Sequence, residues 1–349
     1  MAETPSRSVT ISAIAAEAGV SAPTVSRVLN GRGDVAPETR ERIENLLRAR
    51  GYRRRGSRAG GERRGGERIG LFDLVFNDLD SPWAVEIIRG VEDAAHSMGS
   101  GIAVSAIHRQ ASSTRQWLQN VRSRASDGAV LVTTDLDSDL RTELDELHIP
   151  VVVIDPVGLS DLTVPTIGCT NWAGGLSATS HLIDLGHRRI AFVAGRPELW
   201  CSRARLDGYR AGMETAGLDV DPELVVPGQF DYESGFRAGE RLFDLAEPPT
   251  AVFAASDQMA LGVYEALRQR GLRVPDDVSV VGFDDLPQAR WSSPPLTTVR
   301  QPLDDMGRLA VRTLRRLMDS EEIESPRVEL ATELVVRDST APLLSVAKK

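Results

Sequence analysis

The sequence is poor in lysine, in cysteine and in long apolar runs. Its 349 residues contain only two lysines, Lys348 and Lys349, and two cysteines, Cys169 and Cys201. Two isolated cysteines argue against a disulfide framework and suit a reducing cytoplasm. With five scattered histidines they are too few for a zinc site, and we expect no metal and no other cofactor. No stretch approaches the ~20 apolar residues of a membrane helix, and residues 1–8 hold no apolar signal-peptide core.

Charge is distributed unevenly along the chain. Residues 1–68 carry 14 arginines and 8 acidic residues, a net charge of +6, whereas the remainder carries −15. A basic segment on an acidic body is typical of a nucleic-acid-binding module joined to a part that should not touch DNA. A solvated basic tail would have the same charge as a nucleic-acid-binding module. The residue pattern therefore has to decide between these two interpretations.

The basic segment has the pattern of three short helices. A first helix follows Thr10, which can cap its free amides, and ends at Gly19. Ser21 caps a second helix, and a third runs from near Pro37 to Gly51. The side chains expected to form a common apolar core are Ile11, Ile14, Ala15, Ala18, Val20, Val25, Val28, Leu29, Ile43, Leu46 and Leu47.

Two short helices joined by a tight glycine turn, with a third closing the core, predict a helix-turn-helix domain rather than a generic small helical bundle. Its second helix would enter the major groove with the N-terminal end leading, so that Ala22, Pro23 and Arg27 face base edges. Arg27 can donate two hydrogen bonds to guanine. Contacts to phosphate, which fix register without reading sequence, are expected from Thr24, Ser26, Asn30, Thr39 and Arg40.

The run VTISAIAAEAGVSAPTVSRVLNGRGDVAPETRERIENLLRARGY resembles the DNA-binding domain of the lactose/galactose repressor (LacI) family. The resemblance implies that Ala22 and Pro23, which follow the serine cap, set operator choice together with Arg27. Ala22 and Pro23 are small and poor in donors, so we expect apolar contact, for example with a thymine methyl. The full predicted DNA-binding set is Thr10, Ser21, Ala22, Pro23, Thr24, Ser26, Arg27, Asn30, Thr39, Arg40, Tyr52, Arg53, Arg54 and Arg55.

The segment behind this domain departs from the family pattern. Family members continue with a hinge helix that presses a leucine into the minor groove. Residues 53–68 read RRRGSRAGGERRGGER, which is rich in glycine and contains no leucine. Because each glycine costs a helix ~1 kcal/mol relative to alanine, we predict a flexible Gly/Arg linker that orders on DNA. Arginine entry into the minor groove, by Arg53–Arg55, is the substitute hypothesis.

From Arg68 onward, buried strands alternate with helices. Strands are predicted at 69–76, 102–107, 128–132, 151–154, 188–194, 250–254 and 278–283. Helices are predicted at 83–98, 112–124, 138–147, 172–185, 203–217, 232–246 and 257–270. This alternation predicts doubly wound parallel α/β sheets, and two such runs in succession predict two lobes. Ligands of such sheets bind at the carboxyl ends of the strands, which here places the site in the cleft between the lobes.

Four further stretches resemble the effector-binding core of the same family, a periplasmic-binding-protein type I fold: GGLSATSHLIDLGHRRIAFVAG, SRARLDGYRAGM, AASDQMALGVYEALRQRGLRVPDDVSVVGFDD and PPLTTVRQPLDDMG. The resemblance implies three crossovers between the lobes. The predicted domains are a helix-turn-helix domain at 1–52, the linker at 53–68, an N-terminal lobe at 69–167 and 301–327, a C-terminal lobe at 168–300 and 328–342, and a tail at 343–349.

Charged and aromatic residues gather where the predicted strands end. Acids at the carboxyl ends of buried strands and arginines at helix starts can bind pairs of sugar hydroxyls. Tryptophan faces stack on the apolar faces of sugar rings, and we expect at least two of four loop tryptophans in the cleft, although core or dimer contact is the alternative for each. Trp117, within a helix, is expected to pack in the core. The predicted effector-binding set is Trp83, Asp155, Trp172, Trp200, Arg203, Arg205, Ser256, Asp257, Asp284 and Trp291.

The family resemblance supports part of this set. It matches Asp155, Arg205, Asp257 and Asp284 to effector contacts and places Ser256 where the lactose repressor has an asparagine. These matches imply a mono- or oligosaccharide, with cello- or xylo-oligosaccharides as the narrower suggestion. A phosphosugar would need more cationic groups, and a nucleobase is the other alternative.

The sequence therefore predicts a cytoplasmic bacterial transcription regulator, associated with the nucleoid when bound. We expect a homodimer that represses carbohydrate-utilisation genes from a near-palindromic operator and is released by a sugar; a corepressor-driven regulator and an activator are the alternatives. A periplasmic sugar-binding protein would need a signal peptide and no helix-turn-helix. An enzyme is not expected, because no nucleophile–base pair, metal set or phosphate loop accompanies the cleft acids.

Overall fold

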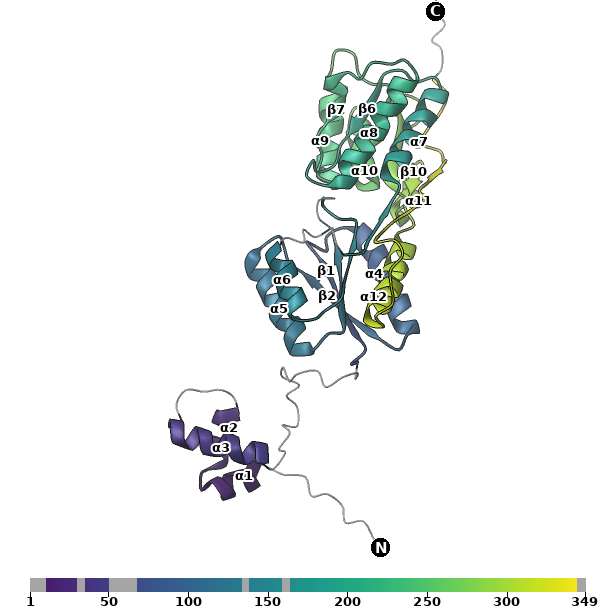
Figure 1. The fold of residues 1–349 in the computed structure, drawn as a ribbon. Coiled ribbons are helices and arrows are strands. Elements are labelled where there is room, and N and C mark those ends of the chain that lie inside the picture. Colours follow the sequence, from purple (N-terminus) through teal and green to yellow (C-terminus); the bar gives the residue numbers. More distant parts are fainter. Residues whose placement is uncertain (1–10, 30–34, 50–67, 134–137, 159–163, 344–349) are drawn as a thin grey trace, which may run out of the picture. The chain divides into compact units, whose positions relative to one another are not determined.

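The computed structural model describes residues 11–29, 35–49, 68–133, 138–158 and 164–343. They fall into two units that divide after Ala59, and each unit is described by itself (Figure 1). Within the described ranges, no helix is both long and apolar enough to cross a membrane.

The first unit contains three helices: α1 (Ile11–Ala18), α2 (Ala22–Leu29) and α3 (Pro37–Ala49). One fully buried side chain from each helix, Ile14, Val25 and Ile43, forms the centre of its core. The predicted helices and this core are confirmed. Because each helix is too short to be stable alone, their packing around one core is what holds them.

The turn between α1 and α2 has the predicted chemistry. Gly19 has a φ of +65°, a left-handed conformation that a side chain would strain. The Oγ atom of Ser21 accepts from the backbone N–H of Thr24 at 3.3 Å and lies 2.8 Å from the Thr24 hydroxyl. Ser21 therefore caps α2 and fixes the angle at which the second helix leaves the turn.

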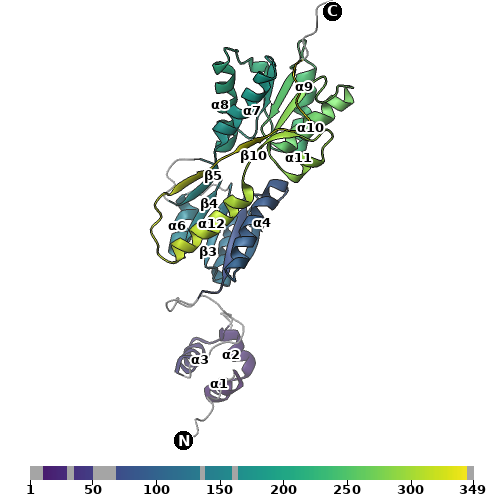
Figure 2. The same ribbon diagram turned by 90° about the vertical axis from the view of Figure 1, so that its right-hand side faces the viewer.

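The second unit consists of two α/β lobes, each built on a six-stranded sheet (Figures 1 and 2). The N-terminal lobe has the strand order β11-β5-β4-β3-β1-β2, all parallel. Its strands are β1 (Leu71–Phe76), β2 (Gly101–Ala106), β3 (Gly128–Val132), β4 (Val151–Ile154), β5 (Thr166–Cys169) and β11 (Arg327–Leu330). One face is covered by α4 (Pro82–Ser97) and α12 (Leu303–Met318), and the other by α5 (Ala111–Arg124) and α6 (Ser138–Glu146).

The C-terminal lobe has the strand order β12-β10-β9-β8-β6-β7, with only the edge strand β12 antiparallel. Its strands are β6 (Ile190–Val193), β7 (Val225–Val226), β8 (Ala251–Ala254), β9 (Ser279–Asp284), β10 (Thr297–Arg300) and β12 (Glu333–Val335). Helices α7 (Asn171–Asp184) and α8 (Trp200–Thr215) pair on one face, and α9 (Tyr232–Phe243) and α10 (Asp257–Gln269) on the other (Figure 2). A short 3-10 helix (Pro222–Leu224) precedes β7, and α11 (Pro287–Trp291) follows β9.

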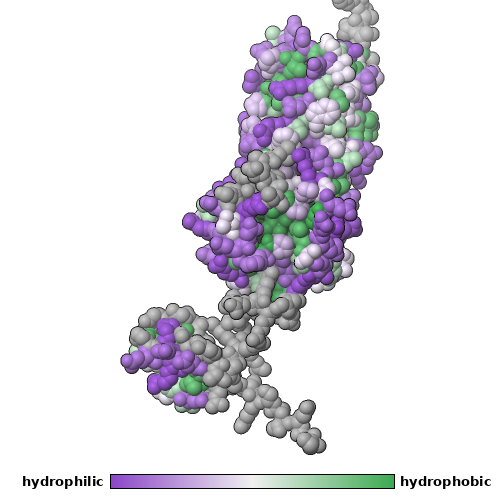
Figure 3. All heavy atoms as spheres, viewed as in Figure 1, coloured by the Kyte–Doolittle hydropathy of each residue, from purple (hydrophilic) through white to green (hydrophobic). Residues whose placement is uncertain are grey.

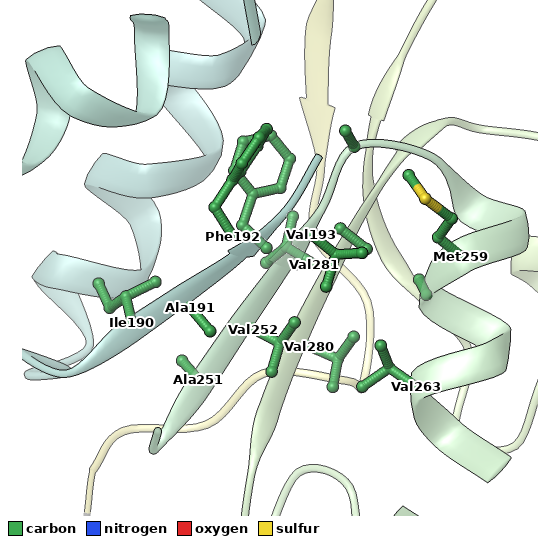
Figure 4. Packing of buried hydrophobic residues seen from close by; sticks show 14 of the residues in the cluster. Ile190, Ala191, Phe192, Val193, Ala251, Val252, Met259, Val263, Val280 and Val281 are labelled. Atoms are coloured by element: carbon green, nitrogen blue, oxygen red, sulfur yellow. The ribbon is translucent and has the colours of Figure 1, made fainter. Parts of the chain in front are cut away.

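Apolar strand residues form the core of each lobe. In the C-terminal lobe, Phe192, Val252 and Val281 of neighbouring strands are fully buried in one apolar cluster, to which α10 contributes Met259 (Figure 4). The Phe192 ring stacks on that of Tyr209 of α8, with the centroids 5.2 Å apart. The near-continuous apolar runs read from the sequence are what a parallel sheet with two covered faces requires. The predicted fold, a helix-turn-helix unit plus two doubly wound lobes, is confirmed, and so is the burial of Trp117, which is 3% exposed.

The chain crosses between the lobes three times, as predicted. It crosses after β5, between β10 and α12, and between β11 and β12. Strand β11 pairs with β5 in the N-terminal lobe, although the predicted boundary placed all but its first residue in the C-terminal lobe. Residues 168–169 likewise complete β5 rather than begin the C-terminal lobe. Both differences arise because these short strands carry too little apolar periodicity to be seen in the sequence.

The packing of α4 on α12 gives a first testable expectation. A Cβ atom at Gly90 would lie 2.0 Å from the backbone oxygen of Asp304, so the two helices meet at a distance that only glycine permits. Replacing Gly90 by alanine should destabilise the N-terminal lobe by about 3 kcal/mol, since overpacking there must move backbone. Gly168→Ala is the control, because a Cβ there meets nothing within 4 Å. Urea unfolding of both variants would test this, and equal stabilities would contradict it.

Candidate functional site

A cavity of about 390 Å³ lies between the two lobes, at the carboxyl ends of their strands. This volume is within the ~300–1,000 Å³ that encloses small molecules. The lining combines five carboxylates, three guanidinium groups, amides and hydroxyls with three aromatic rings. It consists of Phe76, Asn77, Asp78, Asp80, Ser81, Trp83, Ala84, Arg109, Val132, Thr133, Asp155, Arg196, Leu199, Cys201, Arg205, Gln229, Phe230, Asp231, Ser256, Gln258 and Asp284.

Five of the ten predicted effector residues line this cavity: Trp83, Asp155, Arg205, Ser256 and Asp284. They come from both lobes and from five different strand ends or helix starts. Trp83 stands in the first turn of α4, where the Ser81 hydroxyl accepts from its backbone N–H at 3.3 Å. Ser256 caps α10 through the N–H of Met259 and still faces the cavity. The rule that sites form at strand carboxyl ends therefore located the cavity.

The other five predicted residues do not line the cavity. Asp257 is fully buried and accepts from Leu286 N at 2.8 Å and Thr298 Oγ1 at 2.5 Å, so it holds the loop after β9. Trp172 and Trp200 are 48% and 36% exposed in the first turns of α7 and α8, and Trp291 is 77% exposed on α11. The exposed Arg203 lies over the Trp200 ring, with its Cζ atom 5.6 Å from the centroid. The expectation of at least two tryptophans in the cleft is wrong, since only Trp83 lines this cavity.

Arg205 is the best-connected side chain of the cavity. It is 3% exposed, and its Nε atom donates to Asn171 Oδ1 at 2.8 Å while Nη1 donates to the Ala255 carbonyl at 2.6 Å. Nη1 also lies 3.5 Å from Asp284 Oδ1, and the guanidinium carbon lies 3.7 Å from the centroid of the Phe283 ring. Because these contacts fix the plane of the guanidinium group, its remaining N–H groups can donate to a ligand in a constant direction.

The two buried carboxyls beside Arg205 have raised pKa values. Burial raises the pKa of Asp284 to about 7, although Arg205 and the Gln301 amide both favour its ionised form. Burial also raises the pKa of Asp155, against the opposing effects of Arg205 and of a hydrogen bond with the Cys201 thiol. Such carboxyls need hydrogen-bond partners from a ligand to be fully satisfied when ionised.

Several lining residues escaped the sequence-based prediction. Asn77 follows β1, Arg196 follows β6 and Gln229 follows β7, so each stands at a strand end. The buried Nε atom of Arg196 has no hydrogen-bond partner among the described residues, which leaves a donor for a ligand oxygen. Their signal was the position after a strand end, which the prediction applied to acids, tryptophans and the arginines at the start of α8 but not to these three residues.

The first unit presents part of its predicted DNA-binding set on α2 and α3. Pro23 and Arg27 are exposed on α2, whereas Ala22 is partly buried against the small core. The backbone of Ser26 lies on the same helix. Thr39 and Arg40 are partly exposed in the first turns of α3. Ser21 and Thr24 stand at the start of α2, where they form its cap. The other six predicted contacts lie outside the described residues: Thr10, Asn30, Tyr52, Arg53, Arg54 and Arg55.

Comparison with known proteins gives the family. Residues 10–55 match the model for bacterial regulatory proteins of the lacI family, and residues 179–340 match a periplasmic binding protein-like domain. The chain is similar to the HTH-type transcriptional regulator CelR of Thermobifida fusca, with 37% identity over 95% of this chain and 98% of that protein. The chain belongs to the LacI family.

Solved LacI-family structures agree with this assignment. The structure described as a transcriptional regulator CelR–cellobiose complex has a TM-score of 0.72 at 36% identity, covering 95% of this chain and 99% of that one. The lac repressor dimer bound to operator and the anti-inducer ONPF has a TM-score of 0.69 at 27% identity, covering 96% and 100%. This LacI-family chain is a DNA-binding transcription regulator that responds to an effector, and its family consists of regulators rather than enzymes.

Proposed function

We propose that this protein is a homodimeric repressor of carbohydrate-utilisation genes, and that a neutral mono- or disaccharide in the inter-lobe cavity releases it from its operator. The observation that carries the proposal is the lining of the cavity, in which five carboxylates and three arginines stand beside three aromatic rings. Carboxylates and guanidinium groups bind pairs of hydroxyls, and aromatic rings cover the apolar faces of sugars.

The charge of the cavity favours a neutral ligand over a phosphosugar. The five carboxyl groups of Asp78, Asp80, Asp155, Asp231 and Asp284 share the cavity with only three guanidinium groups, and a phosphate would meet repulsion from each carboxyl that is ionised. The complex of the similar CelR contains cellobiose, which makes β-linked glucose or xylose disaccharides the first candidates. The enclosed volume suits one or two sugar rings better than a longer chain.

Two contacts between the lobes border the cavity and offer a route to lobe movement. The Ser81 hydroxyl of the N-terminal lobe donates to Gln258 Oε1 of the C-terminal lobe at 3.3 Å. Arg109 and Glu198 form a second inter-lobe pair at 3.6 Å. Because Ser81, Arg109 and Gln258 all line the cavity, a ligand there would change these contacts. A coupling of ~1–3 kcal/mol between effector and operator would suffice for partial release.

An exposed edge supports the proposed homodimer. Strand β2 is the edge of the N-terminal sheet, and apolar side chains gather over this part of the lobe in Figure 3. Val104 on β2 is 38% exposed and Val85 on the adjoining α4 is 51% exposed. Uncovered sheet edges with apolar side chains pair readily with another chain. The similar lac repressor was solved as a dimer on its operator.

The effector class can be tested without knowing the operator. Thermal-shift measurements would compare cellobiose, xylobiose and glucose with glucose 6-phosphate and hypoxanthine. A ligand at ~100 times its Kd stabilises by ~2.7 kcal/mol, which is a clear shift in Tm. We expect shifts with neutral sugars only. Shifts with hypoxanthine or the phosphosugar alone would overturn the sugar proposal.

Release from DNA is tested with operators recovered by sequencing the DNA that the purified protein binds. A gel-shift titration with the stabilising sugar should then lower operator affinity. Undiminished operator binding at saturating sugar would contradict induction and favour a corepressor mechanism.

The DNA-reading role proposed for Arg27 gives a second prediction. Because Arg27 is exposed, Arg27→Ala should leave the unfolding free energy nearly unchanged. It should weaken operator binding by about 1–3 kcal/mol and relax discrimination at a single base pair. Fluorescence anisotropy with the recovered operator and its single-base variants would measure both. Arg122→Ala, at an exposed arginine of α5, is the control. An equal loss of operator affinity in this variant would mean that net charge, and not a contact of Arg27 with a base, sets the affinity.

A further inference from the structure

The loop that carries Asp284 is strained. Asp284 and Asp285 have φ angles of +123° and +57°, a region that residues with side chains rarely adopt. Such conformations persist only where the surroundings hold them, and they gather at ligand sites. The side chain of Asp284 faces the cavity, whereas that of Asp285 does not line it. Asp257 holds one side of this loop by accepting from Leu286 N, and the contacts of Asp285 show what holds the other side.

Asp285 is buried among three arginines. Its side chain is 2% exposed, and Oδ1 accepts from Arg337 Nη2 at 2.5 Å. Oδ2 accepts from Arg300 Nε at 2.8 Å and lies 3.7 Å from Arg290 Nη2. Arg337 in turn donates to the Leu296 carbonyl at 2.8 Å, which fixes it to the strand that precedes the second crossing.

Two of these arginines, Arg300 and Arg337, adjoin the segments that join the lobes. Arg300 is the last residue of β10, just before the chain crosses to α12, and Arg337 follows β12, just after the third crossing. Gln301, the next residue after Arg300, donates to Asp284 Oδ1 at 2.6 Å and accepts from the Cys169 thiol at 3.1 Å. Cys169 ends β5, directly before the first crossing. The loop at Asp284 and Asp285 is therefore connected to all three crossings.

We propose that Asp285 is a positioning residue: its ion pairs with Arg300 and Arg337 hold Asp284 toward the cavity and connect effector binding at Asp284 to the segments that move when the lobes close. The link to effector binding rests on the proposed function, whereas the positioning of Asp284 by Asp285 does not depend on it. A carboxylate that served stability alone would not need partners in particular segments. The Asp285 carboxylate pairs with Arg300 and Arg337, so it connects the loop beside the cavity to two of the segments that join the lobes.

A readout without ligand tests the positioning. Because the pKa of Asp284 is raised to about 7, the unfolding free energy should fall as pH rises through 7. The groups that face Asp284 are Arg205, Asp155, Asp257 and Gln301. In Asp285→Asn the loop loses its anchor, the released guanidinium groups attract the Asp284 carboxylate, and its pKa should fall toward the ordinary value.

The experiment measures urea unfolding between pH 5.5 and 8.5 for the full chain, and cellobiose binding by calorimetry. Asp285→Asn should lose at least half of the pH-dependent change in stability and at least tenfold in cellobiose affinity. Arg300→Gln removes one partner of Asp285, an arginine whose side chain is 42% exposed. It should reduce the pH-dependent change in stability and the cellobiose affinity in the same direction but by less. This variant decides the question if Asp285→Asn does not fold.

Asp73→Asn is the matched control, because Asp73 is fully buried, pairs with Arg124 at 2.5 Å and does not line the cavity. It should lower stability but keep both the pH slope and the cellobiose affinity. A wild-type pH slope in both Asp285→Asn and Arg300→Gln would overturn the positioning role. If the wild type binds no neutral sugar, the proposed effector class fails, while the pH slopes still decide the role of Asp285.

Discussion

Replacing Arg205 by methionine is expected to abolish the response to effector while operator binding persists. The guanidinium group is 3% exposed and holds Asn171, the Ala255 carbonyl and Asp284 in their present positions. Methionine fills much of the same volume but leaves the buried carboxyls of Asp155 and Asp284 without their cation. Effector affinity should fall at least 100-fold, about 2.7 kcal/mol, and stability by about 3 kcal/mol, as when one partner of a buried pair is removed.

Arg203→Met is the matched control for this prediction. Arg203 lies two residues earlier on α8, is exposed and does not line the cavity. Its replacement should change effector affinity by less than twofold. Calorimetry with the stabilising sugar and gel shifts on the recovered operator would compare the two variants. Equal effector affinities in Arg205→Met and the wild type would show that the ligand binds elsewhere.

The second large effect concerns pH. Burial raises the pKa of Asp284 to about 7, so the folded state keeps a proton that the unfolded chain loses near pH 4. Between these values the folded state binds more protons, and stability must fall as pH rises through about 7. A shift of roughly 3 pH units corresponds to roughly 4 kcal/mol between pH 4 and pH 8. Asp284→Asn, which cannot ionise, should remove the part of this slope that Asp284 contributes and weaken effector binding at least tenfold.

Other buried groups titrate as well. Burial raises the pKa of Asp155, and burial together with the neighbouring Asp284 carboxylate raises the pKa of Asp257, so both contribute a fall in stability of the same sign. Burial lowers the pKa values of His181 and His187, which makes stability rise with pH, but that contribution ends near pH 6.5. Because the two histidines contribute equally to the wild type and the variant, the difference between their slopes isolates the contribution of Asp284, which is largest below pH 7. Asp80→Asn is the control, because Asp80 is an exposed carboxylate of the same cavity and should leave the slope intact. An unchanged, wild-type slope in Asp284→Asn would assign the proton to another group.

The main architecture could be predicted from the sequence because long strands and helices leave strong periodic signals. The runs that became β3, β4, β6 and β8 are apolar throughout, as strands covered on both faces require. Strand β7 has two residues, and β11 alternates charged and apolar residues over only four. Such short strands exist because neighbouring strands offer them hydrogen bonds, and that support is not visible in the local sequence.

The position of a residue at the end of a buried strand predicted the lining of the cavity for two acids but not for every acid and tryptophan near such an end. Asp155 and Asp284 follow buried strands, and the parallel sheets bring both to one cavity. Trp172 and Trp200 come three and seven residues after the ends of β5 and β6, in the first turns of α7 and α8, where their rings are partly exposed to solvent. Asp257 follows a strand as well, yet its carboxylate turns back to bind Leu286 and Thr298. The direction of a side chain within a turn depends on tertiary contacts.

The interleaving of the two sheets has a consequence for how the protein is made. Strand β5 is complete early in synthesis, but its partner β11 leaves the ribosome only after the whole C-terminal sheet except β12. Until then β5 presents an open edge beside an N-terminal sheet that also lacks the cover of α12. Nascent chains in this interval should attract chaperones and bind to one another, since exposed strand edges template association. Because each sheet contains strands from separate parts of the chain, truncating the gene at one point cannot produce either lobe with its complete sheet.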